Sequence, residues 1–253
     1  MSKAAPHLDN PPIVEAVLDL DCDLPPSLDL AVLETKARDA FQQQYPKFRT
    51  QLVEEHTLEQ DPDKPTRHST RRHLQALQFL HDDERQLVQV RTQGFSFNRL
   101  APYSSFDNYL PEIERTWRQF CELTAPVQIR AVRLRYINRL LLPLSTAGWD
   151  LEEYFRVSPR LPDEAGLILR GFFHQHAAHS TATGHDANIV LTSQPPVDEK
   201  LPIIFDITVL APRTLPIDSW DQVIGQVRSL RNLKNLIFAN TLTEKCLNLF
   251  QVP

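Results

Sequence analysis

The chain has 253 residues, of which 42% are hydrophobic, and its formal net charge is −5. This length and composition predict a globular protein with a full core, whereas the weak, mixed charge does not favour nucleic acid or an anionic membrane as a partner. Only six glycines occur, and neither GxGxxG nor a P-loop motif is present. Dinucleotide-binding and P-loop functions are therefore not favoured, and no cofactor is expected.

Cys22, Cys121 and Cys246 are far apart, odd in number and embedded in apolar patterns. This pattern is typical of reduced core thiols rather than of disulfides, and it favours the cytoplasm. The first residues contain no apolar segment of a signal peptide, and no later apolar run approaches the length of a membrane span. We therefore expect a soluble, cytoplasmic protein with no membrane partner.

The stretch Gln128–Pro143, QIRAVRLRYINRLLLP, predicts one long β-strand with two different faces. Arg133, Arg135 and Arg139 fall on one parity, so a pleated strand presents three guanidinium groups on one side. The other parity is apolar and comprises Val132, Leu134, Tyr136, Leu140 and Leu142. The strand is therefore expected to bury one face and expose a row of arginines.

A second two-faced strand is predicted from Pro12 to Leu24. Its even positions are apolar or small, and its odd positions form an acidic row of Glu15, Asp19, Asp21 and Asp23. Pro25 and Pro26 end this strand, and Ser27 is expected to cap a helix that ends before Pro46.

The chain then alternates between short strands and helices. Strands are expected at 48–58, 74–80 and 86–92, and the last of these continues past a kink at Gly94 to Leu100. The segment Asp61–Arg72 is expected to be a solvated loop because it has no apolar residue. Helices are expected at 106–123 and from Asp218, and a short helix at WDLEEYF turns Leu151, Tyr154 and Phe155 inward. Further strands are expected at 167–176, 188–193 and 202–211, and Thr241 with Glu244 predicts a capping box for a final helix.

Both halves of the chain thus share the order strand, helix, three strands, helix. NRLAPYSSF and TVLAPRTLPIDSW also leave a strand through Leu-Ala-Pro and enter a helix that begins with an aromatic residue. These features predict an α+β fold with an internally duplicated antiparallel sheet and helices packed on one face. The half-repeats would be 1–125 and 126–253, joined in one continuous structural unit.

Several segments carry a resemblance to a known family: PPIVEAVLDL, GFSFNRLAPY, RLRYINRL, WDLEEYF and LTEKCLNLF. Together they span most of the chain and resemble a sporadically distributed bacterial family of proteins of about this length, with LRYINR as the most specific part. The family has no assigned activity, so the resemblance implies relatives but no catalytic residue or cofactor.

The arginine row allows two interpretations. Guanidinium groups bind phosphate bidentately, so Arg133, Arg135 and Arg139 are candidates for holding a nucleotide or a nucleic-acid backbone. We favour the alternative, in which the acidic row of the first strand pairs with them across the sheet, because the two rows match in length and parity.

Other sites are less favoured. The acidic row has oxygen ligands for Mg²⁺ or Mn²⁺, as in tunnel enzymes that hydrolyse triphosphates, but the ExExK motif of those enzymes is missing. His174 and His176 share a strand face and would form a metal site with Asp206, although the following AAHSTATGHD reads as an exposed loop that simply tolerates histidine. No metal site is assigned. No nucleophile has the flanking residues of a catalytic triad, so no catalytic residue is assigned either.

GFSFNR, at 94–99, places Phe95 and Phe97 on one parity. Exposed aromatics beside Asn98 and Arg99 would stack bases, but two phenylalanines on one parity are more often core, so nucleic acid is not favoured.

We therefore expect a non-enzymatic binding or protein-interaction module of a bacterial accessory or defence-type locus, whose partner is another protein or a second copy of the chain. The alternative is an enzyme or sensor that acts on a phosphorylated small molecule or nucleotide at a charged sheet face. In either case the candidate ligand-binding residues are Arg133, Arg135, Arg139, Asn98, Arg99, Glu15, Asp19 and Asp21.

Overall fold

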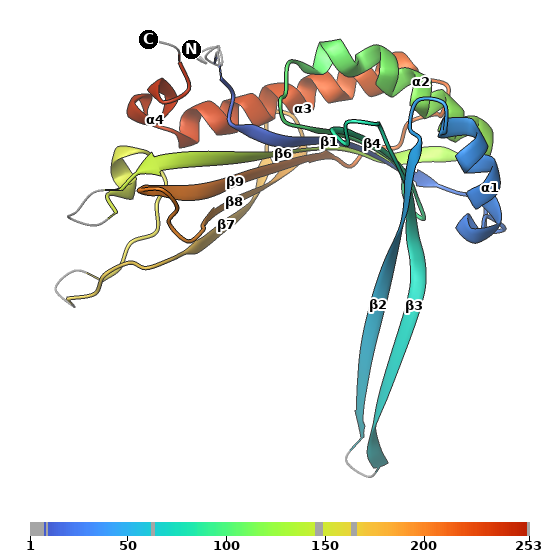
Figure 1. The fold of residues 1–253 in the computed structure, drawn as a ribbon, viewed down its shortest axis with the longest axis horizontal. Helices are drawn as coiled ribbons and strands as arrows, with labels where there is room; N and C mark the ends of the chain where they lie inside the picture. Colours follow the sequence, from blue (N-terminus) through green and yellow to red (C-terminus); the bar gives the residue numbers. More distant parts are fainter. Residues whose placement is uncertain (1–7, 9, 62–63, 145–148, 163–165, 252–253) are drawn as a thin grey trace.

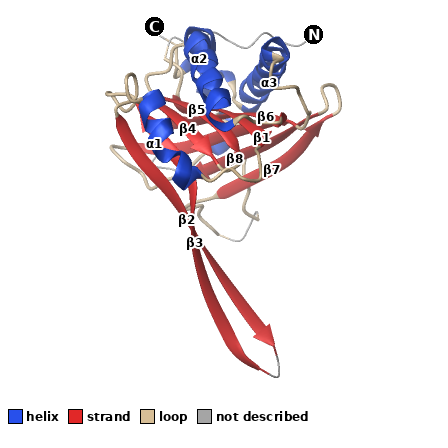
Figure 2. Ribbon diagram, turned by 90° about the vertical axis from the view of Figure 1, so that its right-hand side faces the viewer, coloured by secondary structure: helices blue, strands red, loops and turns tan. Residues whose placement is uncertain are grey.

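A computed structural model describes residues 8, 10–61, 64–144, 149–162 and 166–251, and of residues 57–61 and 64–68 it describes only the backbone. In this part of the chain, nine strands form one antiparallel sheet and four α-helices lie on one of its faces (Figures 1 and 2). The predicted α+β class with an antiparallel sheet is confirmed. None of the helices in the described ranges is both long and apolar enough to span a lipid bilayer.

The elements have the following bounds. The strands are β1 (Ile13–Asp23), β2 (Lys47–Asp61), β3 (Lys64–Leu80), β4 (Gln86–Arg91), β5 (Gly94–Leu100), β6 (Gln128–Pro143), β7 (Phe173–Ser180), β8 (His185–Ser193) and β9 (Lys200–Ala211). The helices are α1 (Leu30–Phe41), α2 (Phe106–Thr124), α3 (Trp220–Thr241) and α4 (Glu244–Asn248), and a short 3-10 helix, η1, spans Leu151–Glu153.

The two strands with alternating sequences lie side by side at the centre of the sheet, whose order is β2-β3-β4-β5-β1-β6-β9-β8-β7. β1 and β6 are antiparallel, with Leu18 opposite Leu134 and Asp19 opposite Arg133. Because side chains alternate along a strand, one register buries the apolar rows against the helices and brings the charged rows together on the opposite face. The predicted parities are therefore confirmed for 15–21 and 132–142, whereas the register of β1 shifts after Asp21, before Asp23.

The helices cover the apolar face through large aromatic contacts. Trp117 of α2 is 3% exposed and meets Phe95 of β5 edge to face, with ring centroids 5.7 Å apart. On α3, Phe238 stacks on Phe205 of β9 at 5.7 Å. Aromatic pairs at these separations add specific attraction to the burial of apolar area. The helices predicted at 106–123 and from Asp218 are confirmed, since α2 spans Phe106–Thr124 and α3 begins at Trp220.

Two predicted helix caps are wrong. Asp29, not Ser27, caps α1, since its Oδ1 accepts a hydrogen bond from the Ala31 backbone N–H at 2.8 Å. For α4 the cap is Thr243, whose hydroxyl accepts from the Cys246 N–H, because Thr241 still belongs to α3. The segment WDLEEYF forms only a three-residue 3-10 helix, although Leu151, Tyr154 and Phe155 are buried as predicted.

The solvated loop predicted at Asp61–Arg72 is wrong. From Lys64 onward this segment belongs to β3, which pairs with β2 to form a long two-stranded arm that extends away from the helices, and residues 62 and 63 lie outside the described ranges (Figure 1). Backbone pairing makes a strand whether or not the side chains are apolar, and the side chains of Ser69, Thr70, Arg71 and Arg72 are exposed. Polarity therefore indicated exposure, not the absence of a strand.

The strand predicted to continue through Gly94 is also wrong. β4 and β5 are separate and antiparallel, joined at Thr92 and Gln93, so the first half has four strands after α1 instead of three. Gly94 has φ +136°, and a Cβ there would lie 2.1 Å from the backbone oxygen of Leu20. Only glycine allows this close approach of the hairpin to β1.

The strand predicted at 167–176 begins only at Phe173, and the segment read as an exposed loop after it is largely strand. Ala177–Ser180 ends β7, and His185 begins β8 after a turn at 181–184. Short polar strands at a sheet edge lack the apolar alternation on which the prediction relied.

The open face of the sheet as candidate functional site

The sheet face opposite the helices, called the open face below, carries the charged rows of β1 and β6. No helix of the described chain lies over it in either ribbon view (Figures 1 and 2). The row on β1 consists of Glu15, Val17, Asp19 and Asp21, and its neighbours on β5 are Ser96 and Asn98. Charged side chains are stable on this face because it is only partly buried and because opposite charges pair with one another there.

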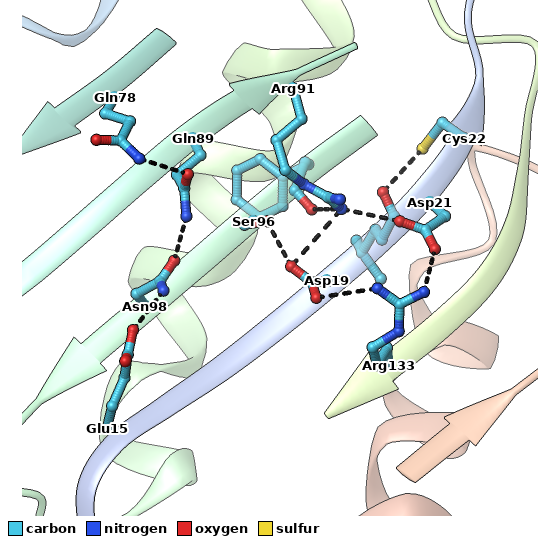
Figure 3. A network of polar contacts seen from close by, with 12 residues as sticks. Glu15, Asp19, Asp21, Cys22, Gln78, Gln89, Arg91, Ser96, Asn98 and Arg133 are labelled. Atoms are coloured by element: carbon cyan, nitrogen blue, oxygen red, sulfur yellow. Dashed lines mark hydrogen bonds and ion pairs between the residues drawn. The ribbon is translucent and has the colours of Figure 1, made fainter. Parts of the chain in front are cut away.

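A chain of side-chain amides crosses five strands of the open face, and Figure 3 shows its part from Gln78 to Glu15. Gln78 donates to Gln51 at 3.3 Å and to Gln89 at 2.9 Å, and Gln89 donates to Asn98 at 3.0 Å. Asn98 in turn donates to the Glu15 carboxylate at 2.7 Å. Each amide thus has a hydrogen-bond partner on a neighbouring strand, and the bonds link this half of the open face into one network.

Beside the amide chain lies a compact cluster of two aspartates and two arginines (Figure 3). Asp21, 8% exposed, accepts from Arg91 and from Arg133, each at 2.9 Å. Asp19 lies 3.6 Å from the Arg91 guanidinium and 3.5 Å from that of Arg133, and it accepts from the Ser96 hydroxyl. Two carboxylates and two guanidinium groups make the cluster neutral, so their burial is compensated internally.

The other two arginines of the row behave differently from Arg133. Arg135 is held by Asp206 of β9, with Nε 2.9 Å and Nη2 2.5 Å from Oδ2, and these hydrogen bonds raise the pKa of the Arg135 guanidinium. Arg139 is exposed and forms no ion pair with any described residue. Pairing across the sheet therefore holds Arg133 as favoured above, but the partner of Arg135 is on β9, not on the acidic strand.

Next to Arg133 the open face has a shallow hollow of about 490 Å³. Its floor includes Thr208 and Leu210 of β9, and its far side is formed by His179 of β7 with Asp186 and Asn188 of β8. His179 Nδ1 lies 2.7 Å from an Asp186 carboxylate oxygen. The hollow thus offers both signs of charge beside an apolar floor, as protein partners use for side-chain contacts.

Arg99 does not belong to the open face. Its parity is that of Phe95 and Phe97, which are 0% and 3% exposed in the core, and its guanidinium lies 5.1 Å from the ring centroid of Tyr109 on α2. The structure therefore separates two neighbouring candidates, because Asn98 points to one face of the sheet and Arg99 to the other. The phenylalanines of GFSFNR are core residues and cannot stack bases.

The histidine pair is not close to its proposed acidic partner. His174 and His176 of β7 contact each other, and His174 lies opposite Leu191, which is buried on the helix-covered side of the sheet. The two histidines therefore lie on the helix-covered side, whereas Asp206 lies on the open face. Within the described ranges, no group of three or more histidine, cysteine or acidic residues is placed to hold a metal ion. Burial raises the pKa of the Cys121 and Cys246 thiols to about 12, so neither is an activated nucleophile.

Sequence reasoning did not place Gln51, Gln78, Gln89 or Arg91 in the open-face network, and it considered Asp206 only as a metal-site partner of the histidine pair. Arg91 and Gln89 come from β4, whose sequence QLVQVR shows only that polar residues alternate with apolar ones. A comparison with models of known protein families finds no match to this chain, and no curated protein sequence is significantly similar to it.

Proposed function

We propose that this protein is a non-enzymatic binding module that holds a partner protein against the open face and the β2–β3 arm. The observation that carries this proposal is the arm itself. Its strands have 15 and 17 residues, beyond the roughly 3–10 that are usual, and a two-stranded hairpin is only marginally stable by itself. An arm of this length on the side away from the helices is explained by a surface that it contacts elsewhere (Figure 2).

The described part of the arm has the composition of a contact surface. Glu54 lies opposite Arg72 and Glu55 opposite Arg71, and all four side chains are exposed. Opposite charges in register favour the hairpin and discourage unspecific pairing along its edge. They also present both signs of charge to a partner, which gives specificity and a faster encounter more than raw affinity.

The open face supports a binding role better than phosphate chemistry. Arg133 and Arg135 already have carboxylate partners, so a phosphate would have to displace Asp21 or Asp206. Displacement leaves a desolvated carboxylate without a partner, which costs free energy. The assignment to a bacterial accessory or defence-type locus rests on the family resemblance alone.

The test is a shortened arm. Residues 54–72 are deleted and Val53 is joined to its register partner His73 through an Asn-Gly turn. Tyr45 and Phe79, which pack in the core at the base of the arm, are kept, so the melting temperature should remain that of the wild type. A partner captured by the wild-type protein from its native host, then purified, should bind the shortened variant at least tenfold more weakly.

The matched control is Arg118→Gln, which removes an exposed ion pair with Glu114 on α2, far from the open face. It should leave the affinity unchanged. Equal affinity of the purified partner for the shortened variant and the wild type would refute the role of the arm. If the captured partner is a second copy of the chain, the shortened variant should sediment as a monomer.

We also propose that the sheet arose by duplication. From the central pair, β5, β4 and β3 follow outward from β1, and β9, β8 and β7 follow outward from β6. The helices α2 and α3 come after β5 and β9, respectively. The proposal requires that residues 13–124 superpose on 128–241 with β1 on β6 and α2 on α3, and a superposition that matches other strands would contradict it.

A further inference from the structure

A cavity of about 190 Å³ lies on the helix-covered side of the sheet, where α3 passes over β1 and β6 (Figure 1). Its apolar walls are Pro11, Pro12 and Ile13 at the start of β1 and Phe238 on α3. For comparison, an apolar cavity of about 150 Å³ is large enough to bind benzene. The cavity therefore has room for a ligand somewhat larger than benzene.

One cationic side chain lines this cavity without an anionic partner among the residues that the structure describes. Lys234 of α3 is partly buried, its Nζ lies 4.2 Å from the ring centroid of Tyr136, and it forms no ion pair with any described residue. Burial, with the nearby charge of Arg231, lowers the pKa of Lys234 to about 8. Arg231 itself is bound to Asp107, 3.1 Å away. An ammonium that is desolvated beside apolar walls is stabilised most by an anion.

A buried amide lies on the same cavity. Asn138 of β6 is 2% exposed, and its Nδ2 donates to the backbone oxygen of Phe205 at 2.9 Å. Its Oδ1 accepts no hydrogen bond from a described residue. Asn138 lines the cavity, so its amide oxygen is available as an acceptor for a ligand there.

We propose that this cavity binds a small organic carboxylate, with the carboxylate group on Lys234 and the apolar body against Pro12 and Phe238. Phosphate is less suitable, because guanidinium forks or several backbone N–H groups are its usual ligands and the lining offers one ammonium. A hydroxyl group on the ligand would donate to Asn138 Oδ1. The cavity and the open face lie on opposite sides of the sheet, so this proposal is independent of the proposed function.

Isothermal titration with benzoate tests the proposal, with benzamide as its uncharged counterpart and phenyl phosphate as the competing anion. The wild-type protein should bind benzoate with a dissociation constant on the order of 1 mM or lower, as expected for a ligand of this size. Benzamide and phenyl phosphate should each bind at least tenfold more weakly. No benzoate binding, or tighter binding of either other compound, would overturn the proposal.

Two variants locate the site. Lys234→Met keeps the length of the side chain and removes its charge, so benzoate should bind at least tenfold more weakly. Lys245→Met is the matched control, since Lys245 also lies over a tyrosine ring, at 5.0 Å from Tyr154, but is exposed and paired with Glu153. Affinity for benzoate that is unchanged in Lys234→Met, or reduced equally in both variants, would refute the assignment.

A measurement on the wild-type protein keeps the test valid if Lys234→Met does not fold. An acylating reagent is applied with and without saturating benzoate, and the modified lysines are quantified by peptide mass spectrometry. Benzoate should slow the acylation of Lys234 several-fold and leave that of Lys245 unchanged. Equal acylation of Lys234 in both samples would contradict the proposal.

Discussion

At Asp21, a carboxylate that is 8% exposed lies between the guanidinium groups of Arg91 and Arg133. The two arginines are not equivalent. The side chain of Arg91 is 15% exposed and that of Arg133 is 33% exposed, so water compensates the loss of Arg133 better. Arg91 also donates to the Phe95 backbone oxygen at 3.0 Å. The cluster therefore depends more on Arg91, which comes from a strand with no conspicuous charge pattern.

We predict that Arg91→Gln lowers the free energy of unfolding by about 1.5–3 kcal/mol, the range for hydrogen bonds to charged groups. Arg133→Gln should cost about 1 kcal/mol or less, since Arg91 remains as a partner for both aspartates. Arg139→Gln is the control and should change stability by less than about 0.5 kcal/mol, because Arg139 has no ion pair in the described chain. Urea denaturation measures all three, and equal losses would show that the cluster is not the stabilising feature.

Lys234 gives a pH-dependent prediction. Its pKa is lowered to about 8 in the folded protein and is about 10.4 for an unperturbed lysine. Between these values the unfolded chain binds a proton that the folded chain does not, so stability contributed by this group rises with pH there and is constant below pH 8. The pH-dependent stability that Tyr103, Tyr136 and Arg231 contribute is present in both proteins, so it cancels when the wild type is compared with Lys234→Met. The free energy of unfolding of the wild type should rise relative to the variant from pH 8 to pH 10, and a flat difference would contradict the lowered pKa.

Among the elements, α2 and α3 cover the sheet to different extents at their tryptophans. Trp117 lies in the middle of α2, is 3% exposed and contacts both Phe95 and Phe120. Trp220 is the first residue of α3 and is only partly buried against the core. Both residues belong to long amphipathic helices, but the position along the helix decides how deeply each is buried.

We predict that Trp117→Ala costs about 3–5 kcal/mol, as for other large buried aromatics. Trp220→Ala should cost less than half of that, because part of its ring already faces water. Chemical denaturation measures both losses. The comparison is valid if the free energy of unfolding depends equally on denaturant concentration in the two variants. A loss below about 1 kcal/mol for Trp117→Ala would mean that α2 does not pack on the sheet as described.

At the scale of the whole molecule, one sheet unites both halves of the chain. The boundary expected at Ala125 falls between α2 and β6, and the pairing of β1 with β6 crosses it. Because the shared core runs under all three long helices, neither half has a closed core of its own in this arrangement. At this central seam Asp19 and Asp21 pair with Arg91 and Arg133, and Arg135 pairs with Asp206, so these charges neutralise one another.

This neutrality predicts the response to phosphorylated ligands. Nucleotides, pyrophosphate and short single-stranded oligonucleotides, with or without Mg²⁺, should not raise the melting temperature of the wild-type protein, because no bound state is favoured by mass action. A thermal-shift series checks this. A rise that disappears in the triple variant Arg133→Gln, Arg135→Gln, Arg139→Gln would favour the phosphate-binding alternative over the binding module.

The sequence by itself determined the class of the fold and the faces of its main elements. The alternation in 13–23 and 128–143, and the helical spacing in 106–124, each follow from a local period that the backbone imposes on side-chain direction. These patterns identified most of the core and the acidic and arginine rows of the open face, since burial of apolar side chains is a strong and local signal.

The matched charged rows already favoured β1 and β6 as neighbours, but only the tertiary structure decided the order of the other strands. The pairing of Arg135 with Asp206, the entry of Arg91 into the aspartate cluster and the side of the sheet on which Arg99 lies depend on strand order and register, which no local period encodes. The β2–β3 arm was hidden for a related reason. Its polar residues carry no burial pattern, and its strands, which follow each other in the chain, are specified by backbone hydrogen bonds that no side-chain period marks.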